Sequence, residues 1–526
     1  MAPALLALAA AALAAAAQAA PKTAAPAAAP SSKAAPPAID AAAPAAAAPK
    51  DAARKDAPAE PAAPAEKIEP ATRELYDEAL QAHAKGNRRK SAQLLFAWLR
   101  GSSRTAEAYD AAQHLLADDL HALGLTHAAL VYEAQVIRTR ARPELLPEAL
   151  QRMEAWTSAG PHDEDRFEGE VLRGADFGLI EGPARPFVAY QQGAADLKSN
   201  GDRWAESKFA ELPDGSPYKA KARLLTAALK LGRGDQPQGP LSEFEDIAGD
   251  KDSSREVRNE ARISAARLRF EAGDFKGALA HYEAIDLPEL DPGRGQLYLE
   301  QAWTRYRMGD GGRAMGLLAA LEAPSFRALF LPEKYLLRAL IYKDACHWLA
   351  AKRAARTLLR RWGESLQAVQ ERRTLTAEPQ LAEAAQQKGA GRKARELVET
   401  LAKERETLGR YASAWDGGLF QRLVELYTAE QAEAERRRQL ELEKGVIRAA
   451  DDLLRAAEQV SLVDYEVGLA LYRRARGSGP QSPLTFQDVA PGKGELAYGF
   501  DGEYWNDELF HYRFSLPNRC ATGVQP

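Results

Sequence analysis

Residues 260–321 contain one structural unit twice, as EARISAARLRFEAGDFKGALAHYEAI (260–285) and LYLEQAWTRYRMGDGGRAMGLLAAL (297–321). In each copy a helical run ends at a Gly-Asp pair, beginning at Gly273 and at Gly309, and a second helical run follows. An alanine stands seven residues before each turn glycine and another five residues after it. Glycine accepts the left-handed conformation that ends a helix, and small residues let two helix backbones approach closely. The stretch therefore predicts pairs of amphipathic helices joined by a tight turn.

The same frame runs along most of the chain. An alanine lies seven residues before every turn position, and these positions are Gly86, Gly124, Gly201, Gly234, Gly273, Gly309, Cys346 and Gly389. The frame shifts by one residue at Gly201. The double gap before Gly201 predicts a further copy near Gly160, where residues 143–158 read as a helix. Tandem copies at this period predict an α-solenoid, in which each unit buries its apolar face against its neighbours.

These residues resemble the tetratricopeptide-repeat family, whose unit is a helix hairpin of about 34 residues. The spacing here is longer, and the tryptophan that the family carries early in its first helix is missing. The resemblance covers roughly residues 70–405. It implies an all-α fold, a right-handed superhelical solenoid of about eight to nine hairpins, and work as a protein-binding scaffold.

The amino-terminal 66 residues predict a compartment and a tether. Residues 1–19 are apolar and end in the small-x-small sequence Ala17-Gln18-Ala19, which is typical of a signal peptide, although no Lys or Arg precedes the apolar run. The alternative is an alanine-rich tail on a cytosolic protein. Residues 20–66 are rich in Ala and Pro and predict a disordered linker. We expect an exported protein, periplasmic or associated with the outer membrane of a bacterial envelope.

Charge and histidine placement argue against several functions. A net charge of -4 gives no electrostatic case for nucleic acid or an anionic membrane, and no apolar run is long enough for an integral membrane span. His114, His121 and His127 could converge, but no cysteine or carboxylate completes a recognisable ligand set. We therefore expect no metal, no cofactor and no enzymatic activity.

The pattern of the sequence changes twice in the carboxy-terminal part. Residues 406–476 are charged and helical, and predict an exposed helix or a short coiled coil. Residues 477–526 contain two stretches that alternate in polarity, 495–500 and 509–516, and these predict a β-hairpin. Its aromatic side chains must dock, on the solenoid or on a partner protein; they are Tyr498, Phe500, Tyr504, Trp505, Phe510 and Tyr512. Cys346 and Cys520 could form a disulfide that straps this segment to the solenoid.

The first helix of each hairpin is expected to line a concave face that binds protein partners. The side chains predicted on that face are Arg267, Phe270, Glu271, Trp303, Tyr306, Arg307 and Lys343. The alternative is that Phe270 and Tyr306 pack between repeats.

Function is predicted at two levels. The general prediction is a scaffold in an envelope complex. A narrower one comes from residues 500–509, FDGEYWNDEL, which resemble a carboxy-terminal signature of envelope repeat proteins associated with bacterial gliding motility. The alternatives are a glycan-binding or regulatory subunit of envelope polysaccharide or peptidoglycan synthesis, and a cytosolic assembly chaperone if the chain is not exported. Partner identity and oligomeric state stay open.

Overall fold

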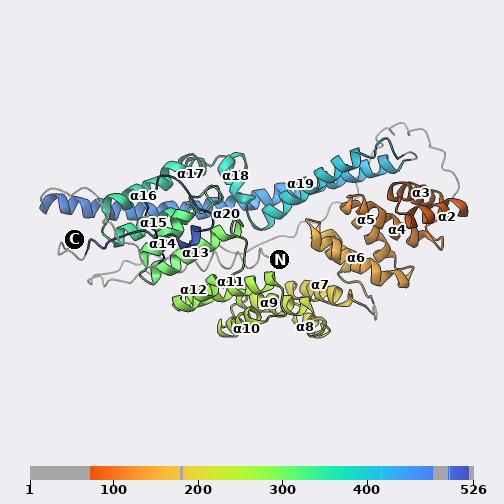
Figure 1. Ribbon diagram of the computed structural model, residues 1–526, viewed down its shortest axis with the longest axis horizontal. Helices are drawn as coiled ribbons and strands as arrows, with labels where there is room; N and C mark the ends of the chain where they lie inside the picture. The colour runs from red at the N-terminus through yellow and green to blue at the C-terminus, as the bar shows by residue number, and fades with distance from the viewer. Residues whose placement is uncertain are drawn as a thin grey trace, which may run out of the picture.

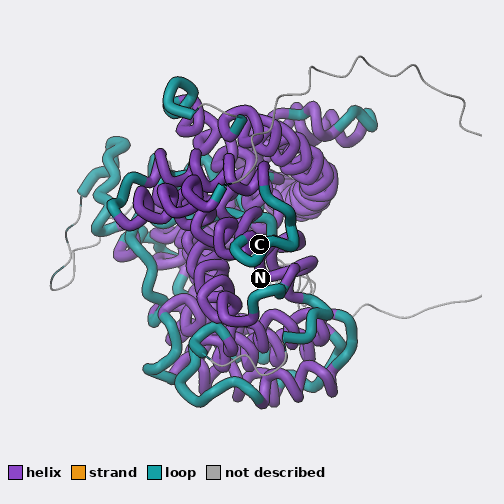
Figure 2. Tube along the Cα trace, turned by 90° about the vertical axis from the view of Figure 1, so that its right-hand side faces the viewer, coloured by secondary structure: helices purple, strands orange, loops and turns teal. Residues whose placement is uncertain are grey.

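The computed structural model describes residues 72–177, 182–415, 418–477, 494, 496 and 498–520. The predicted signal peptide and linker lie outside these residues. Every regular element within the described ranges is a helix (Figures 1 and 2). The α-helices are α2 (Arg73–Ala84), α3 (Arg88–Gly101), α4 (Tyr109–Ala122), α5 (Thr126–Thr139), α6 (Leu146–Ala159), α7 (Arg185–Lys198), α8 (Asp202–Ala210), α9 (Pro217–Gly232), α10 (Gln238–Gly249), α11 (Arg255–Glu271), α12 (Phe275–Glu283), α13 (Gly293–Arg307), α14 (Gly311–Ala320), α15 (Glu333–Asp344), α16 (Trp348–Arg361), α17 (Gly363–Gln370), α18 (Pro379–Ala385), α19 (Gly389–Gly409) and α20 (Leu419–Gly477). The shorter turns are η1 (Pro143–Leu145), η2 (Asp165–Glu170, a π-helix), η3 (Leu375–Ala377) and η4 (Leu509–His511).

Consecutive helices pack as hairpins, and the turn residue explains where each first helix ends. The hairpins are α2/α3, α4/α5, α7/α8, α9/α10, α11/α12, α13/α14 and α15/α16. Gly273 and Gly309 have φ of 81° and 82°, in the left-handed region. At the shifted copy Asn200 (φ 61°) takes that conformation in place of Gly201, which accounts for the one-residue shift. After the first of these glycines, the Asp274 carboxylate accepts a hydrogen bond from Gly277 N at 2.9 Å and caps α12.

The copy predicted near Gly160 is irregular. Helix α6 occupies most of the expected range, but Gly160 is extended rather than left-handed (φ -168°). The chain then forms the π-helix η2 instead of a regular second helix. Because no left-handed turn closes the unit, the frame could not be read at this position.

The core is a series of clusters, each shared by neighbouring hairpins. Phe244 and Ile247 are fully buried between α9, α10 and α11. The next cluster joins Ala266, Tyr282 and Leu297 from α11, α12 and α13. Such a chain of local clusters is what makes a solenoid quasi-one-dimensional.

Helix α20 joins the two ends of this series. It has 59 residues and is therefore about 90 Å long. Near its start, Leu423 and Tyr427 belong to the cluster built by α2–α9; further along, Leu453 and Val460 belong to the cluster of α15, α16 and α18. Figure 1 shows α19 and α20 running along the length of the molecule, across hairpins far apart in sequence.

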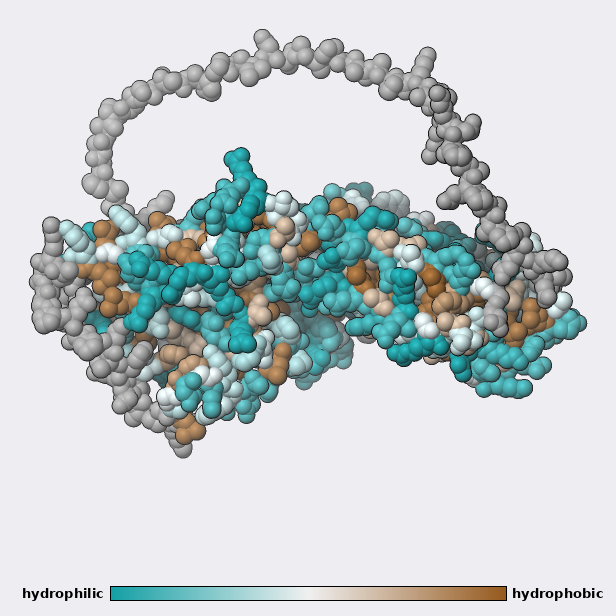
Figure 3. All heavy atoms as spheres, turned by 90° about the horizontal axis from the view of Figure 1, so that it is seen from above, coloured by the Kyte–Doolittle hydropathy of each residue, from teal (hydrophilic) through white to brown (hydrophobic). Residues whose placement is uncertain are grey.

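The predicted helix over residues 406–476 is confirmed by α20 for residues 419–476, but the prediction that it is an exposed helix or a short coiled coil is wrong. A row of small apolar residues packs α20 onto the protein's own hairpins: Ala449, Leu453, Ala456, Val460, Val463 and Val467. Only the opposite side of the helix exposes apolar residues such as Ile447 and Leu462. The face seen from above in Figure 3 is accordingly mostly hydrophilic with scattered apolar spots.

The predicted β-hairpin is also wrong for residues 498–520, which contain no strand. This segment lies on α14, with the short η4 turn packed against that helix. Phe514 N donates a hydrogen bond to Gly312 O at 3.0 Å, so the extended backbone pairs with a helix end and not with another strand. The alternating side chains fit this arrangement because one row, made of Phe510, Tyr512, Phe514 and Leu516, packs against the solenoid next to the fully buried Leu509.

Candidate protein-interaction surface

Arg267, predicted on the concave face, belongs to a buried polar network. Its guanidinium makes two hydrogen bonds to the Glu300 carboxylate, at 3.0 and 2.7 Å. The Tyr282 hydroxyl donates to the same carboxylate at 3.0 Å. Burial alone would raise the pKa of Glu300, but Arg267 and its neighbours hold that pKa below its usual value. Arg267 therefore ties α11 to α13 and is not free to bind a partner.

The predicted aromatic residues are largely structural. Phe270 is buried and packs against Phe275, with ring centroids 5.2 Å apart. Trp303 is half-buried and contacts three of the hydrophobic clusters, so it acts as a junction between hairpins. The Tyr306 hydroxyl donates to Asp344 Oδ2 at 2.5 Å, which links α13 to the end of α15.

The remaining three predicted residues divide between solvent and α20. Glu271 and Arg307 are exposed at the ends of α11 and α13, and the Arg307 guanidinium lies 5.1 Å from the centre of the Phe275 ring. Lys343 instead donates to Glu466 of α20 at 2.8 Å. At α15, then, the protein's own helix α20 supplies the partner of the predicted binding residue, whereas α11 and α13 keep only Glu271 and Arg307 exposed.

The carboxy-terminal aromatic residues separate into two groups. Phe510 and Tyr512 are half-buried and pack against the α13–α15 cluster. Tyr498, Phe500 and Trp505 remain exposed, by 44%, 52% and 41%. Tyr504 lies between the groups, half-buried against the same cluster. The segment is thus docked on its own solenoid by one side and presents aromatic rings on the other.

The end of this segment is covalently attached. Cys520 forms a disulfide with Cys346, the turn residue between α15 and α16, with Cα atoms 5.3 Å apart. Two hydrogen bonds hold the same place: Arg519 N to Ala345 O at 3.1 Å, and His347 Nε2 to Pro517 O at 2.7 Å. We call residues 509–520 the strap.

Reduction of the disulfide is expected to free the end of the strap while leaving the hairpins folded. The bridge closes a loop across 174 residues of sequence, and cross-links over long loops constrain the unfolded chain most, by about 4–5 kcal/mol in the chain-entropy model. Trypsin cleavage after Arg513 and Arg519, followed by mass spectrometry with and without reductant, measures the release. Equal cleavage rates in the two conditions would contradict a stapling role.

No described residues form a clear metal site. His114 Nδ1 lies 2.7 Å from Glu133 Oε1, His121 stacks on Trp156, and His127 Nε2 lies 3.2 Å from Glu430 Oε2, so the three histidines have separate structural partners. One group that sequence reasoning missed, His83 with Asp118 and Asp119, has ligand-like spacing. Its centre is taken by Arg88, whose Nη1 lies 2.7 Å from Asp118 Oδ2 and 3.0 Å from Asp119 Oδ1.

Sequence reasoning also missed the joint between α20 and the first hairpins. Glu404 of α19 accepts hydrogen bonds from the His127 backbone N–H at 2.9 Å and from the Tyr427 hydroxyl at 2.5 Å. Burial raises the pKa of Glu404, and these hydrogen bonds offset only part of that effect. Nearby, the Trp415 indole donates to Arg89 O at 3.0 Å. The available signal was the 4-3 spacing of small apolar residues along α20, which marks a packed seam.

Comparisons with known proteins add little to this geometry. No protein-family model matches the chain, and no curated protein matches it. One solved structure to which it is similar is that of a tetratricopeptide repeat protein from Parabacteroides merdae ATCC 43184. The sequences are 15% identical, the match covers 54% of this chain and 90% of that one, and the TM-score is 0.22. A TM-score this low carries no argument, so the architecture rests on the hairpins themselves.

Over the described residues the chain is a helical repeat protein built of stacked helix hairpins. The left-handed turn residues and the buried alanines before and after them establish this repeat. Among the described residues, no helix has both the length and the apolar composition needed to cross a bilayer.

Proposed function

We propose that this protein is a non-enzymatic scaffold that binds other proteins in a bacterial envelope complex. The observation that carries the proposal is the arrangement of the helices: hairpins are stacked along the chain, and α20 packs against hairpins at both ends of the series. This arrangement holds the surfaces of the hairpins in fixed positions, and extended helical arrays are suited to protein contacts. The right-handed superhelix implied by the family resemblance is part of the proposal.

Export to an envelope compartment is supported by the disulfide. Disulfides such as Cys346–Cys520 persist in oxidising compartments and are rare in the cytosol. The signal-peptide pattern of residues 1–19 points the same way. The narrower proposal, a role in gliding motility, rests on residues 500–509, which comprise the exposed aromatic stretch before the strap and the strap's first residue.

The partner surface that we propose lies at the ends of α11 and α13, around Glu271 and Arg307. Both side chains are exposed, and Arg307 sits over the ring of Phe275. Arginine beside an aromatic ring is a combination that often dominates binding energy at interfaces. Trp303 is excluded because its replacement would disturb three clusters at once.

A photo-crosslinking amino acid at position 271 or 307, introduced in cells, is expected to capture the same partner protein from the envelope fraction. The matched control is position 276, because Lys276 is exposed on α12, the second helix of the same hairpin. The double substitution Glu271→Lys with Arg307→Glu should remove the crosslink and leave the circular dichroism spectrum unchanged. Equal capture from position 276 would refute the assigned surface, and recovery only from the cytosol would refute export.

A further inference from the structure

Helix α16 is a basic helix in a protein of net negative charge. It carries Lys352, Arg353, Arg356, Arg360 and Arg361 and no acidic residue. Lys352 and Arg356 share a single carboxylate, Asp464 of α20, at 3.8 and 3.6 Å.

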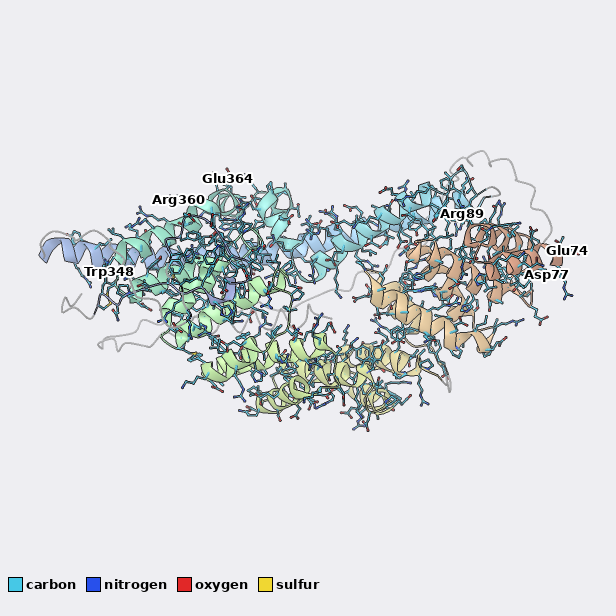
Figure 4. The ribbon with its side chains drawn as sticks, viewed as in Figure 1. Glu74, Asp77, Arg89, Trp348, Arg360 and Glu364 are labelled. Carbon is cyan, nitrogen blue, oxygen red and sulfur yellow. A yellow bond between two sulfur atoms is a disulfide. The ribbon has the colours of Figure 1, made fainter. Side chains whose placement is uncertain are left out.

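Two of these arginines are available to another molecule. Arg353 and Arg360 are exposed, and no carboxylate of the described residues lies within ion-pair distance of either. They are seven residues apart and therefore share one face of the helix. Figure 4 shows Arg360 at the outer edge of the molecule, with Glu364 of the next helix beside it but not paired with it. This face of α16 therefore presents two guanidinium groups that no carboxylate of the described residues neutralises.

The opposite chemistry occurs in residues 498–508, which we call the aromatic loop. Three exposed rings gather there: Tyr498 stacks on Trp505 with centroids 4.8 Å apart, and Phe500 lies edge-on to Tyr504. Four exposed carboxylates surround the rings, and no described residue forms an ion pair with them; they are Asp501, Glu503, Asp507 and Glu508. The loop is held in place by its neighbour Leu509, which is fully buried.

These two surfaces have opposite charges, and their side chains suit each other's stacking and hydrogen-bonding geometry. Guanidinium groups stack on aromatic faces and make bidentate hydrogen bonds to carboxylates, and the aromatic loop offers both kinds of partner together. Within one copy, no ion pair or ring contact among the described residues joins the aromatic loop to α16. Among the described residues, neither surface is paired within its own molecule with the chemistry that the other surface offers.

We propose that this protein self-associates, with the aromatic loop of one copy bound to the Arg353/Arg360 face of α16 in a second copy. Because the two surfaces differ, each copy can bind a neighbour through its aromatic loop and can also bind a neighbour's aromatic loop on its own α16. A twofold arrangement uses both contacts in a closed dimer, and a head-to-tail arrangement uses them in an open chain. Because the contact is largely electrostatic and lies at the surface, it weakens as salt rises.

The test measures the mass of the purified, oxidised full chain in solution by sedimentation, over a range of concentrations and salt. Arg353→Glu with Arg360→Glu is expected to weaken self-association at least about tenfold, and Asp501→Arg with Asp507→Arg to do the same. Combining all four substitutions restores the opposite charges and should recover most of the affinity. Lys352 and Arg356 are left unchanged because they hold α20.

The control is a charge reversal of the same size at the other end of the molecule. Glu74→Arg with Asp77→Arg on α2 changes the net charge as much as the loop variant does, and Figure 4 shows these residues far from α16. This variant should associate like the unmodified protein. A monomer at every concentration and at low salt would overturn the proposal. So would self-association that survives the α16 reversal, because another surface would then be responsible.

Discussion

Gly316→Ala is expected to lift the strap from α14 and to destabilise the protein, although alanine is the better helix former. A Cβ at this position would lie 1.7 Å from the Tyr512 carbonyl oxygen and 2.3 Å from its carbonyl carbon. Contacts of this kind need more than 3 Å, and the nearest atoms are backbone, so the strap must move. Helix propensity alone predicts a gain of about 1 kcal/mol. We expect a net loss of about 2 kcal/mol or more, since Leu509 and its neighbours leave the core.

Hydrogen exchange of residues 509–516 and the melting temperature check this result. The matched control is Gly311→Ala in the same helix, where the added Cβ would meet Ile341 Cγ2 at 3.4 Å and Leu516 Cδ2 at 3.6 Å, which is ordinary contact. That variant should change stability by no more than about 0.5 kcal/mol. If Gly316→Ala leaves the strap protected from exchange and stabilises α14, the close backbone approach is not real.

The glycines of α14 show what the sequence could and could not reveal. The turn glycine and the alanines on either side of it predict a helix hairpin, because local backbone conformation and helix–helix approach are encoded within about 40 residues. Gly312 and Gly316 also indicate a special requirement at these positions, since glycine inside a helix is unfavourable. The reason is the backbone of residues 512–514, about 200 positions later, and only the folded structure identifies it.

The predicted binding face illustrates a similar limit. Helical spacing correctly groups Arg267, Phe270 and Glu271 near the end of one helix, but spacing does not distinguish a residue that faces a neighbouring repeat from one that faces solvent. Arg267 proves to be paired with Glu300, and Lys343 with Glu466 of α20. Both partners come from other helices, and each pairing depends on how the hairpins and α20 stack.

The second large effect is expected from Glu404→Ala, which should loosen α19 and α20 from the amino-terminal hairpins. The substitution removes the carboxylate that accepts hydrogen bonds from the Tyr427 hydroxyl and from the His127 backbone N–H, and both donors are in a buried site. Leaving two buried donors without an acceptor costs about 2–4 kcal/mol. Because a solenoid unfolds locally, that cost should appear where α5 meets α19, and not at α15 and α16.

Hydrogen exchange measured segment by segment tests whether the destabilisation is local. A local loss of about 3 kcal/mol corresponds to amide exchange in α5 and α19 that is faster by about a hundredfold. Glu404→Gln keeps an acceptor oxygen and should lose less. Glu406→Ala is the surface control, because Glu406 is exposed two residues away and, among the described residues, forms an ion pair only with Arg410, at 3.8 Å. Faster exchange spread equally over all hairpins would mean that α20 stabilises the whole frame as one cooperative unit. Unchanged exchange would mean that the apolar contacts of Leu423 and its neighbours hold the joint without Glu404.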